Sequence, residues 1–162
     1  IWGKYANDAN TVDTSDTNTL SDKKHKTHYW MYTVFDDKSW NECQQKGIMV
    51  LGMDDIGDYS QFASKEALRQ ELIDVYDNST SRKNQALMAW NFANTVSVND
   101  VIFAKRSNTL VGKGIVTGGY VFDDLRHEYK NVRTVKWLQV GEWEHPGNAV
   151  AKRLTDIIHR LY

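Results

Sequence analysis

Hydrophobic and polar positions along the chain divide it into short segments that carry either a strand pattern or a helix pattern. Aromatic and β-branched runs bounded by polar or glycine residues predict five strands, over residues 28–35, 48–53, 100–106, 109–122 and 132–140. Apolar positions spaced three and four apart predict four helices, over residues 37–47, 64–77, 84–96 and 148–162. This order, β-α-β-α-α-β-β-β-α without an internal repeat, indicates one mixed sheet with helices.

Local signals support several of these boundaries. The first predicted strand, HYWMYTVF, is apolar on both faces, which is typical of an inner strand. Gly47 follows the first helix as a C-terminal stop, Ser64 precedes the second as an N-cap, and RSNT at 106–109 is a hairpin turn. Glycines inside the longest strand indicate a bulge, a bend or the close approach of another chain: Gly112, Gly114, Gly118 and Gly119. We therefore expect an α+β fold, a small curled mixed sheet or pseudo-barrel with helices packed outside.

The first part of the chain has a different composition. Residues 6–27 are rich in Asn, Asp, Thr and Ser, which bury little apolar surface. We therefore predict a polar linker or arm over residues 1–27 and a folded domain over residues 28–162. The basic run at residues 23–26 is either a phosphate contact or a solvated tail.

Composition limits the class of protein. The chain has 162 residues, 41% hydrophobic and 12% aromatic, which suffices for one domain with a sizeable core. The single cysteine, Cys43, excludes an internal disulfide framework and fits a reducing compartment. No apolar run approaches the roughly 18 residues of a membrane span. Because the chain begins with Ile1 instead of Met, we expect a piece of a longer protein. We expect that protein to be located in the cytoplasm.

Charge is unevenly distributed along the sequence although the net charge is only −1. Residues 1–80 contain 8 Lys/Arg against 14 Asp/Glu, whereas residues 81–162 contain 12 Lys/Arg against 7 Asp/Glu. This asymmetry allows a basic face that binds a polyanion. The alternative is that folding mixes the two halves and no such face results.

Acidic residues after the predicted strands favour turns over a metal site. Asp54, Asp55 and Asp58 do not have the spacing of an EF-hand loop, and Asp and Gly suit turn backbones. Asp36 and Asp37 also follow a strand, where they fit a turn or the start of a helix.

Other catalytic and cofactor motifs are missing from the sequence. The histidines have no convincing ligand spacing, and GKGIVTGG lacks the phosphate-loop pattern. There is no nucleophile elbow of the G-x-S-x-G type. We therefore predict a binding domain without cofactor or metal, not an enzyme.

Several segments in order resemble a known family. HYWMYTVF, KGIMVLGMDDIGDYS, NQALMAWNFANTVSVNDVIFAKRSNTLVGKGIVTGGYVF and RTVKWL resemble the EVE-like branch of the PUA/YTH superfamily. The most similar form stands at the N-terminus of McrB-type subunits of modification-dependent restriction systems. The resemblance runs from about His28 to Trp143 and implies a pseudo-barrel whose mouth holds a modified base. That base is flipped out of duplex DNA in the restriction branch and comes from single-stranded RNA in the YTH branch.

The resemblance also implies site residues. The base-pocket candidates are Phe35, Asp36, Met49, Met53, Asp54, Tyr120 and Phe122. Met49 and Met53 depart from the family pattern, because relatives place tryptophan there. Methionine is an adaptable but poorer stacking wall. The identity of the base therefore stays open.

The predicted contacts to the nucleic-acid backbone are basic side chains of the second half. We name Arg82, Lys83, Arg126, Lys130 and Arg133 first, with Lys105 and Arg106 as further candidates. The cluster from Arg126 to Lys136 is favoured because it lies beside the expected pocket.

The resemblance implies a recognition module for modified duplex DNA in the prokaryotic cytoplasm. Its partners would be the motor and nuclease parts of a restriction complex. We expect no contact with a membrane. Two alternatives stay open. One is an RNA-binding module of the PUA/YTH type, and the other is an interaction domain with a degenerate pocket.

Overall fold

The computed structural model describes residues 26–144 and the backbone of residues 158–161. The predicted arm, residues 1–27, therefore lies almost wholly outside the described residues, as does the segment 145–157. The strands are β1 (Tyr29–Thr33), β2 (Ile48–Leu51), β3 (Val101–Arg106), β4 (Thr109–Val116), β5 (Val121–Phe122), β6 (Asn131–Glu144) and β7 (Ile158–Leu161). The α-helices are α1 (Asp37–Lys46), α2 (Lys65–Val75) and α3 (Lys83–Trp90). Short helical turns are η1 (Asp54–Ile56), η2 (Tyr59–Gln61) and η3, a π-helical turn (Asn91–Thr95) that continues α3.

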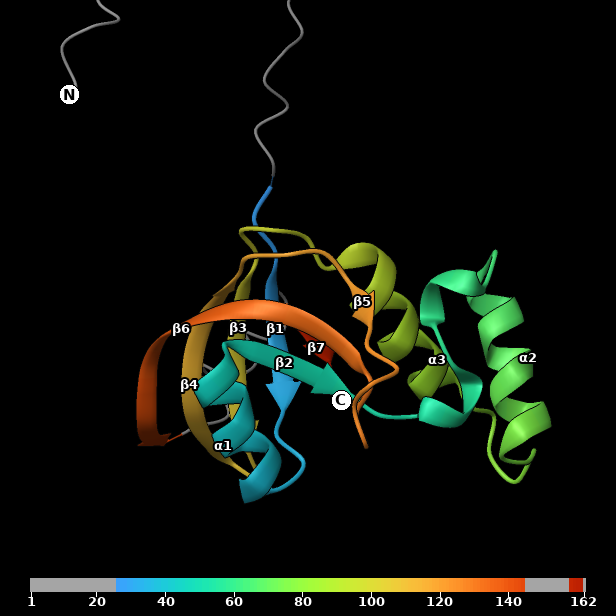
Figure 1. Cartoon of the computed structure of the whole chain (residues 1–162), viewed down its shortest axis with the longest axis horizontal. Coiled ribbons are helices and arrows are strands. Elements are labelled where there is room, and N and C mark those ends of the chain that lie inside the picture. Colours follow the sequence, from blue (N-terminus) through green and yellow to red (C-terminus); the bar gives the residue numbers. More distant parts are fainter. Residues whose placement is uncertain (1–25, 145–157, 162) are drawn as a thin grey trace, which may run out of the picture.

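The strands form one mixed, curled sheet. Its order is β2-β6-β4-β3-β1-β7, and β5 pairs with β6 beside this path. β1 runs parallel to β3 and β7, whereas the other pairs are antiparallel. Figure 1 shows the long strand β6 curling around the sheet, with α1 next to β2 and with α2 and α3 side by side at the edge remote from β4. The predicted α+β fold with a curled mixed sheet is confirmed.

A side chain joins the two parts of the curled sheet. The Tyr32 hydroxyl on β1 donates to the Val50 carbonyl on β2 at 2.8 Å and accepts from the Val50 N–H at 3.2 Å. Tyr32 is 2% exposed, so both hydrogen bonds lie in the core. A hydroxyl can act as donor and acceptor at once. Here it links β1 to β2, which are not paired with each other in the sheet.

The predicted helix signals are confirmed by the cap geometry. Asp36 caps α1, because its carboxylate accepts from the Ser39 N–H at 2.6 Å, and Gly47 ends the helix with φ of 62°. Ser64 caps α2 and accepts from the Ala67 N–H at 3.1 Å. In the described part of the chain, no helix combines the length and the apolar character needed to cross a membrane.

Two glycines of β4 make room for tryptophans of the same chain. A β-carbon at Gly112 would lie 2.7 Å from Trp40 Cη2 on α1, and one at Gly114 would lie 2.9 Å from Trp137 Cε3. Trp40 and Trp137 themselves pack edge to face, with centroids 4.9 Å apart. The register of the β4–β6 pairing also shifts between Leu110 and Gly112 and between Lys113 and Gly114, as the predicted bulge requires, and the space at both glycines is filled by the domain's own core.

Replacing Gly112 with alanine is expected to lower the free energy of unfolding by about 1–3 kcal/mol, because Trp40 must move in a packed core. Chemical denaturation measures this change. Gly119 is the matched control, since a β-carbon there would meet nothing within 4 Å. Equal unfolding free energies for Gly112→Ala and Gly119→Ala would show that α1 does not pack on β4 in this way.

Two predicted elements are wrong in part, and a third, the helix over 84–96, is confirmed with a change of helix type at its end. The predicted helix over 148–162 is contradicted at Ile158–Leu161, which forms β7 and pairs in parallel with β1. The open edge of β1 supplies hydrogen-bond partners there, and this pairing overrides the helical spacing of the apolar residues. The predicted strand 109–122 divides into β4 and β5, and the predicted helix 84–96 ends in the π-helical turn η3.

Candidate functional site

A pair of aromatic rings, one exposed and one half-buried, lies where β1 ends. Phe35 follows β1, and Tyr129 belongs to the loop 123–130 between β5 and β6. Their rings are stacked, with centroids 5.1 Å apart and planes tilted by 13°. Phe35 is 42% exposed, and the Tyr32 ring, 6.5 Å away, meets it edge to face. A large aromatic ring left this exposed offers a flat surface to a ligand.

A carboxylate lies beside the stacked rings. Asp36 uses one oxygen to cap α1, and its other oxygen accepts a weak hydrogen bond from the Tyr129 hydroxyl at 3.5 Å. The hydrogen bond from the Ser39 N–H lowers the pKa of Asp36 below its usual value. Asp36 is therefore ionised at neutral pH and can accept hydrogen bonds but not donate them.

The exit from β2 forms the other side of this region. The Asp54 carboxylate accepts from the Lys130 N–H at 2.9 Å, which ties η1 to the loop 123–130. The Tyr129 ring packs over Gly52, where a β-carbon would lie 3.5 Å from Tyr129 Cδ1. We call this region the aromatic mouth, and it consists of Phe35, Asp36, Gly52, Met53, Asp54 and Tyr129.

Two bulky residues of the aromatic mouth have left-handed backbone conformations. Met53 has φ of 59° and Tyr129 has φ of 50°. Such conformations are uncommon in residues other than glycine, cost about 1–3 kcal/mol each and cluster at functional sites. Their occurrence together in the aromatic mouth supports a functional reading of this region.

A second aromatic group supports the mouth from within. The Tyr120 hydroxyl donates to Asn131 Oδ1 at 2.5 Å and accepts from the Tyr59 N–H at 2.8 Å. Asn131 Nδ2 donates to the Gly52 carbonyl at 3.2 Å, and the Tyr59 hydroxyl donates to the same carbonyl. The Tyr120 ring stacks on Tyr59 and meets Phe92 edge to face. Burial raises the pKa of Tyr120, which keeps this hydroxyl protonated.

The structure brings together four of the seven predicted base-pocket residues: Phe35, Asp36, Met53 and Asp54. Tyr120 belongs to the supporting network, where Tyr59 covers one face of its ring. Phe122 lies on β5 and pairs with Asn131 across to β6.

The prediction for Met49 is contradicted. Met49 is 0% exposed, because β2 is buried on both faces and both sets of alternate side chains enter the core. Met49 therefore cannot line an open pocket.

The prediction for Arg133 is also contradicted. Arg133 is 4% exposed and donates to the carbonyls of Phe92, Ala93 and Gly118 at 2.6, 3.1 and 3.2 Å. Burial lowers its pKa to about 10, so the guanidinium stays charged at neutral pH. The guanidinium thus binds two carbonyls of the π-helical turn, those of Phe92 and Ala93, and the carbonyl of Gly118. Its side chain is therefore not available to bind a phosphate.

Four of the other six predicted phosphate contacts form ion pairs within the protein. Arg82 pairs with Asp77 at 2.9 Å, Arg126 with Glu42 at 2.5 Å and Lys130 with Asp124 at 3.0 Å. Arg106 pairs with Asp37 and Glu142. Lys83, exposed at the start of α3, and Lys105, half-buried at the end of β3, form no ion pair with a described residue. The predicted basic cluster is thus largely neutralised.

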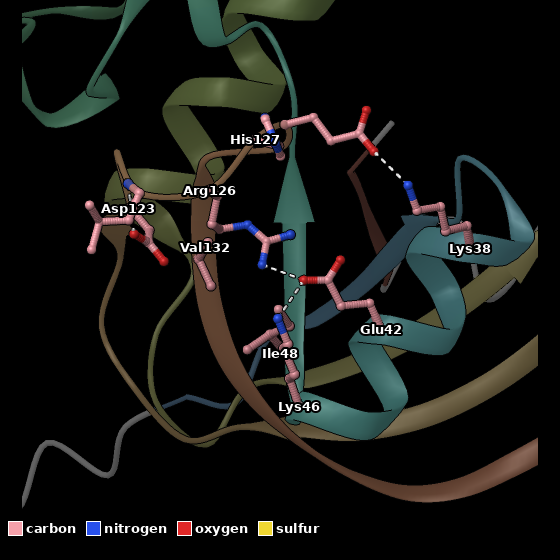
Figure 2. A pocket seen from close by; sticks show the side chains of 10 residues that line it. Lys38, Glu42, Lys46, Ile48, Asp123, Arg126, His127 and Val132 are labelled. Atoms are coloured by element: carbon pink, nitrogen blue, oxygen red, sulfur yellow. Dashed lines mark hydrogen bonds and ion pairs between the residues drawn. The ribbon is translucent and has the colours of Figure 1, made fainter.

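A pocket of about 470 Å³ lies between α1 and the loop 123–130. Figure 2 shows Arg126 reaching across it to Glu42, which also binds Lys46. Glu128 pairs with Lys38. Hydrogen bonding to Arg126 lowers the pKa of Glu42. The remaining lining residues are Ile48, Asp123, Leu125, His127 and Val132. Positive and negative groups of its lining are in balance, so this pocket fits an anion poorly. The ion pairs across it hold the loop 123–130 against α1.

The described residues offer little to redox or metal chemistry. Among them, no group of three His, Cys, Asp or Glu is arranged to hold a metal ion. Asp54 and Asp55 begin η1 and Asp58 caps η2, as a turn interpretation predicts. Burial raises the pKa of Cys43 to about 11, so its thiol is not a ready nucleophile.

Tyr129, Asn131 and Tyr59 were not among the predicted site residues. Tyr129 had one signal, since it is the only aromatic residue in the polar stretch DDLRHEYKN. An aromatic side chain in a charged loop is unusual unless it packs or binds. Asn131 and Tyr59 act through contacts between distant segments, which no local pattern indicates.

Three solved structures resemble this chain at low identity. The YTH domain of Zygosaccharomyces rouxii MRB1, solved with N6-methyladenosine RNA, is 10% identical with a TM-score of 0.41, over 74% of this chain and 63% of that chain. The mmi1 YTH protein–RNA complex is 7% identical with a TM-score of 0.42, over 79% and 64%. The Mmi1 YTH domain is 8% identical with a TM-score of 0.43, over 84% and 76%. The chain thus spans less than two thirds of the length of the first two.

The comparison with curated proteins gave no match. A family model matches residues 30–157, which is most of the sequence and includes the whole aromatic mouth. The chain therefore belongs to the family described as Domain of unknown function (DUF8426).

Proposed function

We propose that this chain is a binding module that holds one unstacked, modified base of a single-stranded nucleic acid, with RNA as the first candidate. The observation that carries the proposal is the exposed Phe35 ring, stacked on the half-buried Tyr129 ring beside the ionised Asp36. A base stacked on an aromatic ring contributes about 1–3 kcal/mol. The proposal assigns binding and no catalysis to the chain.

The chemistry of the aromatic mouth suits the edge of a base. The Asp36 carboxylate can accept an N–H of an exocyclic amine, while Phe35 provides the ring face. Met53 is half-buried and packs against the core, so its thioether can follow the shape of a methyl group. Burying one methyl group contributes about 0.8 kcal/mol, which is about a fourfold gain in affinity.

The charge distribution favours a single strand over a duplex. Duplex binding draws most of its affinity from Lys and Arg that neutralise phosphates. Here Arg82, Arg126 and Lys130 are paired with carboxylates, and Arg133 is buried. A single strand can present an unstacked base to an aromatic surface, and this stacking adds affinity that does not come from phosphate contacts.

Titrations by fluorescence anisotropy at moderate salt test this proposal. The ligands are short RNAs and duplex DNAs of the same sequence, each with one N6-methyladenine, one 5-methylcytosine or no modification. We expect a modified RNA to bind about fourfold tighter than its unmodified form and tighter than the matching duplex. Preference for the modified duplex would favour a recognition module of a restriction system instead. Equal binding of all ligands would favour an interaction domain with a degenerate pocket.

A further inference from the structure

The aromatic mouth carries two carboxylates, and the nearby Lys38, which also helps to lower the pKa of Asp36, forms its ion pair with Glu128. In the described part of the chain, neither Asp36 nor Asp54 forms an ion pair with Lys or Arg. Lys130 is next to Tyr129 but pairs with Asp124, and Arg126 pairs with Glu42. Lys130, Arg126 and Lys38 thus form their ion pairs with carboxylates outside the aromatic mouth.

The stacked rings add to this preference for positive charge. The face of an aromatic ring carries negative potential, and a cation held against it gains about 0.5–2 kcal/mol depending on its exposure to solvent. Phe35 presents such a face next to the Asp36 carboxylate. Carboxylates at the edge of a stacking surface also repel a phosphate that approaches the same place.

From this arrangement we infer that the aromatic mouth selects a base whose methylation leaves its ring protonated and positively charged at neutral pH, such as 1-methyladenine or 3-methylcytosine. The inference rests on the proposed function and adds the charge of the base to it. The flat cationic ring would stack on Phe35, and its positive edge would face Asp36. A neutral methylated base would gain the stacking but not the attraction of the carboxylate.

Isomeric ligands separate charge from size. 1-Methyladenine and N6-methyladenine have the same atoms except for one proton, as do 3-methylcytosine and 5-methylcytosine, and only the first of each pair is cationic at neutral pH. We would measure the affinity of one RNA sequence carrying each base, together with the unmodified RNA. We expect the cationic isomer to bind about 2- to 30-fold tighter than its neutral isomer.

The variant Asp36→Asn removes the charge and keeps the cap of α1, since an asparagine oxygen can also accept from the Ser39 N–H. It should reduce the ratio between the two isomers, because the attraction of the Asp36 carboxylate is lost while that of the Phe35 ring face remains. The control is Asp74→Asn, which removes an exposed carboxylate on α2 that accepts from Gln70 Nε2. It should leave the ratio unchanged. Thermal denaturation checks that both variants are folded.

Each outcome decides between the two proposals. A cationic preference that depends on Asp36 supports the inference. Equal affinities, or tighter binding of the neutral isomers than of unmodified RNA and of the cationic isomers, overturn the inference and leave the proposed function standing. If no modified RNA binds better than the unmodified RNA, the proposed function fails, and the inference fails with it.

Discussion

Replacing Phe35 with alanine is expected to weaken binding of the modified single strand by about 5- to 150-fold, which corresponds to the loss of about 1–3 kcal/mol of stacking. Phe35 is the most exposed ring of the aromatic mouth, and its partner Tyr129 lies on the loop 123–130. The change removes the surface on which a base would stack and the ring that holds Tyr129 in place. Fluorescence anisotropy with the modified RNA measures the effect.

Two further variants make this result specific. Phe35→Trp keeps an aromatic face and should retain most of the affinity. Leu125→Ala removes an apolar side chain that is 99% exposed in the loop 123–130, and it should change nothing. If Phe35→Ala binds the modified RNA as tightly as Leu125→Ala does, then the aromatic mouth is not the binding site.

Replacing Arg133 with methionine is expected to lower the free energy of unfolding by about 3–5 kcal/mol. Three carbonyls, of Phe92, Ala93 and Gly118, then lose a charged donor in the interior. A hydrogen bond to a charged group contributes about 1.5–3 kcal/mol, and an unsatisfied buried carbonyl costs about 1–3 kcal/mol. Urea denaturation followed by circular dichroism measures the change.

Lys136→Met is the matched control for this variant. Lys136 lies on the same strand, β6, but its side chain is exposed, so we expect a change within about 0.5 kcal/mol. A stable Arg133→Met protein that had lost affinity for RNA would return Arg133 to the role of a phosphate contact. Loss of stability below about 1 kcal/mol would contradict its role as the donor to these carbonyls.

Local patterns were sufficient for most of the elements. Asp36, Gly47 and Ser64 each act on the backbone within four residues, so their effects on α1 and α2 can be predicted from neighbouring residues alone. The hairpin between β3 and β4 is local for the same reason. The strand β7 is different, because the sequence from Ile158 to Leu161 fits a helix until the open edge of β1 is available to it.

The site was predictable only in part. Phe35, Asp36, Met53 and Asp54 were named from the family resemblance, and in the structure they follow β1 and β2. Tyr129 joins them through a loop more than 90 residues away from Phe35, and no local spacing encodes that contact. Met49 was a pocket candidate by its position in the family pattern, and Arg133 was a phosphate contact by its charge. Only the packing of both faces of the sheet places them in the core.

The most direct test of the central claim is a titration of isotope-labelled protein with modified and unmodified single-stranded RNA, followed by nuclear magnetic resonance. A base stacked on Phe35 shifts nearby resonances strongly through its ring current. We expect the largest changes at Phe35, Gly52, Met53 and Tyr129, and larger changes with the modified RNA than with the unmodified one. Changes that gather instead around Lys83 on α3, or equal changes with both RNAs, would contradict recognition of a modified base at the aromatic mouth.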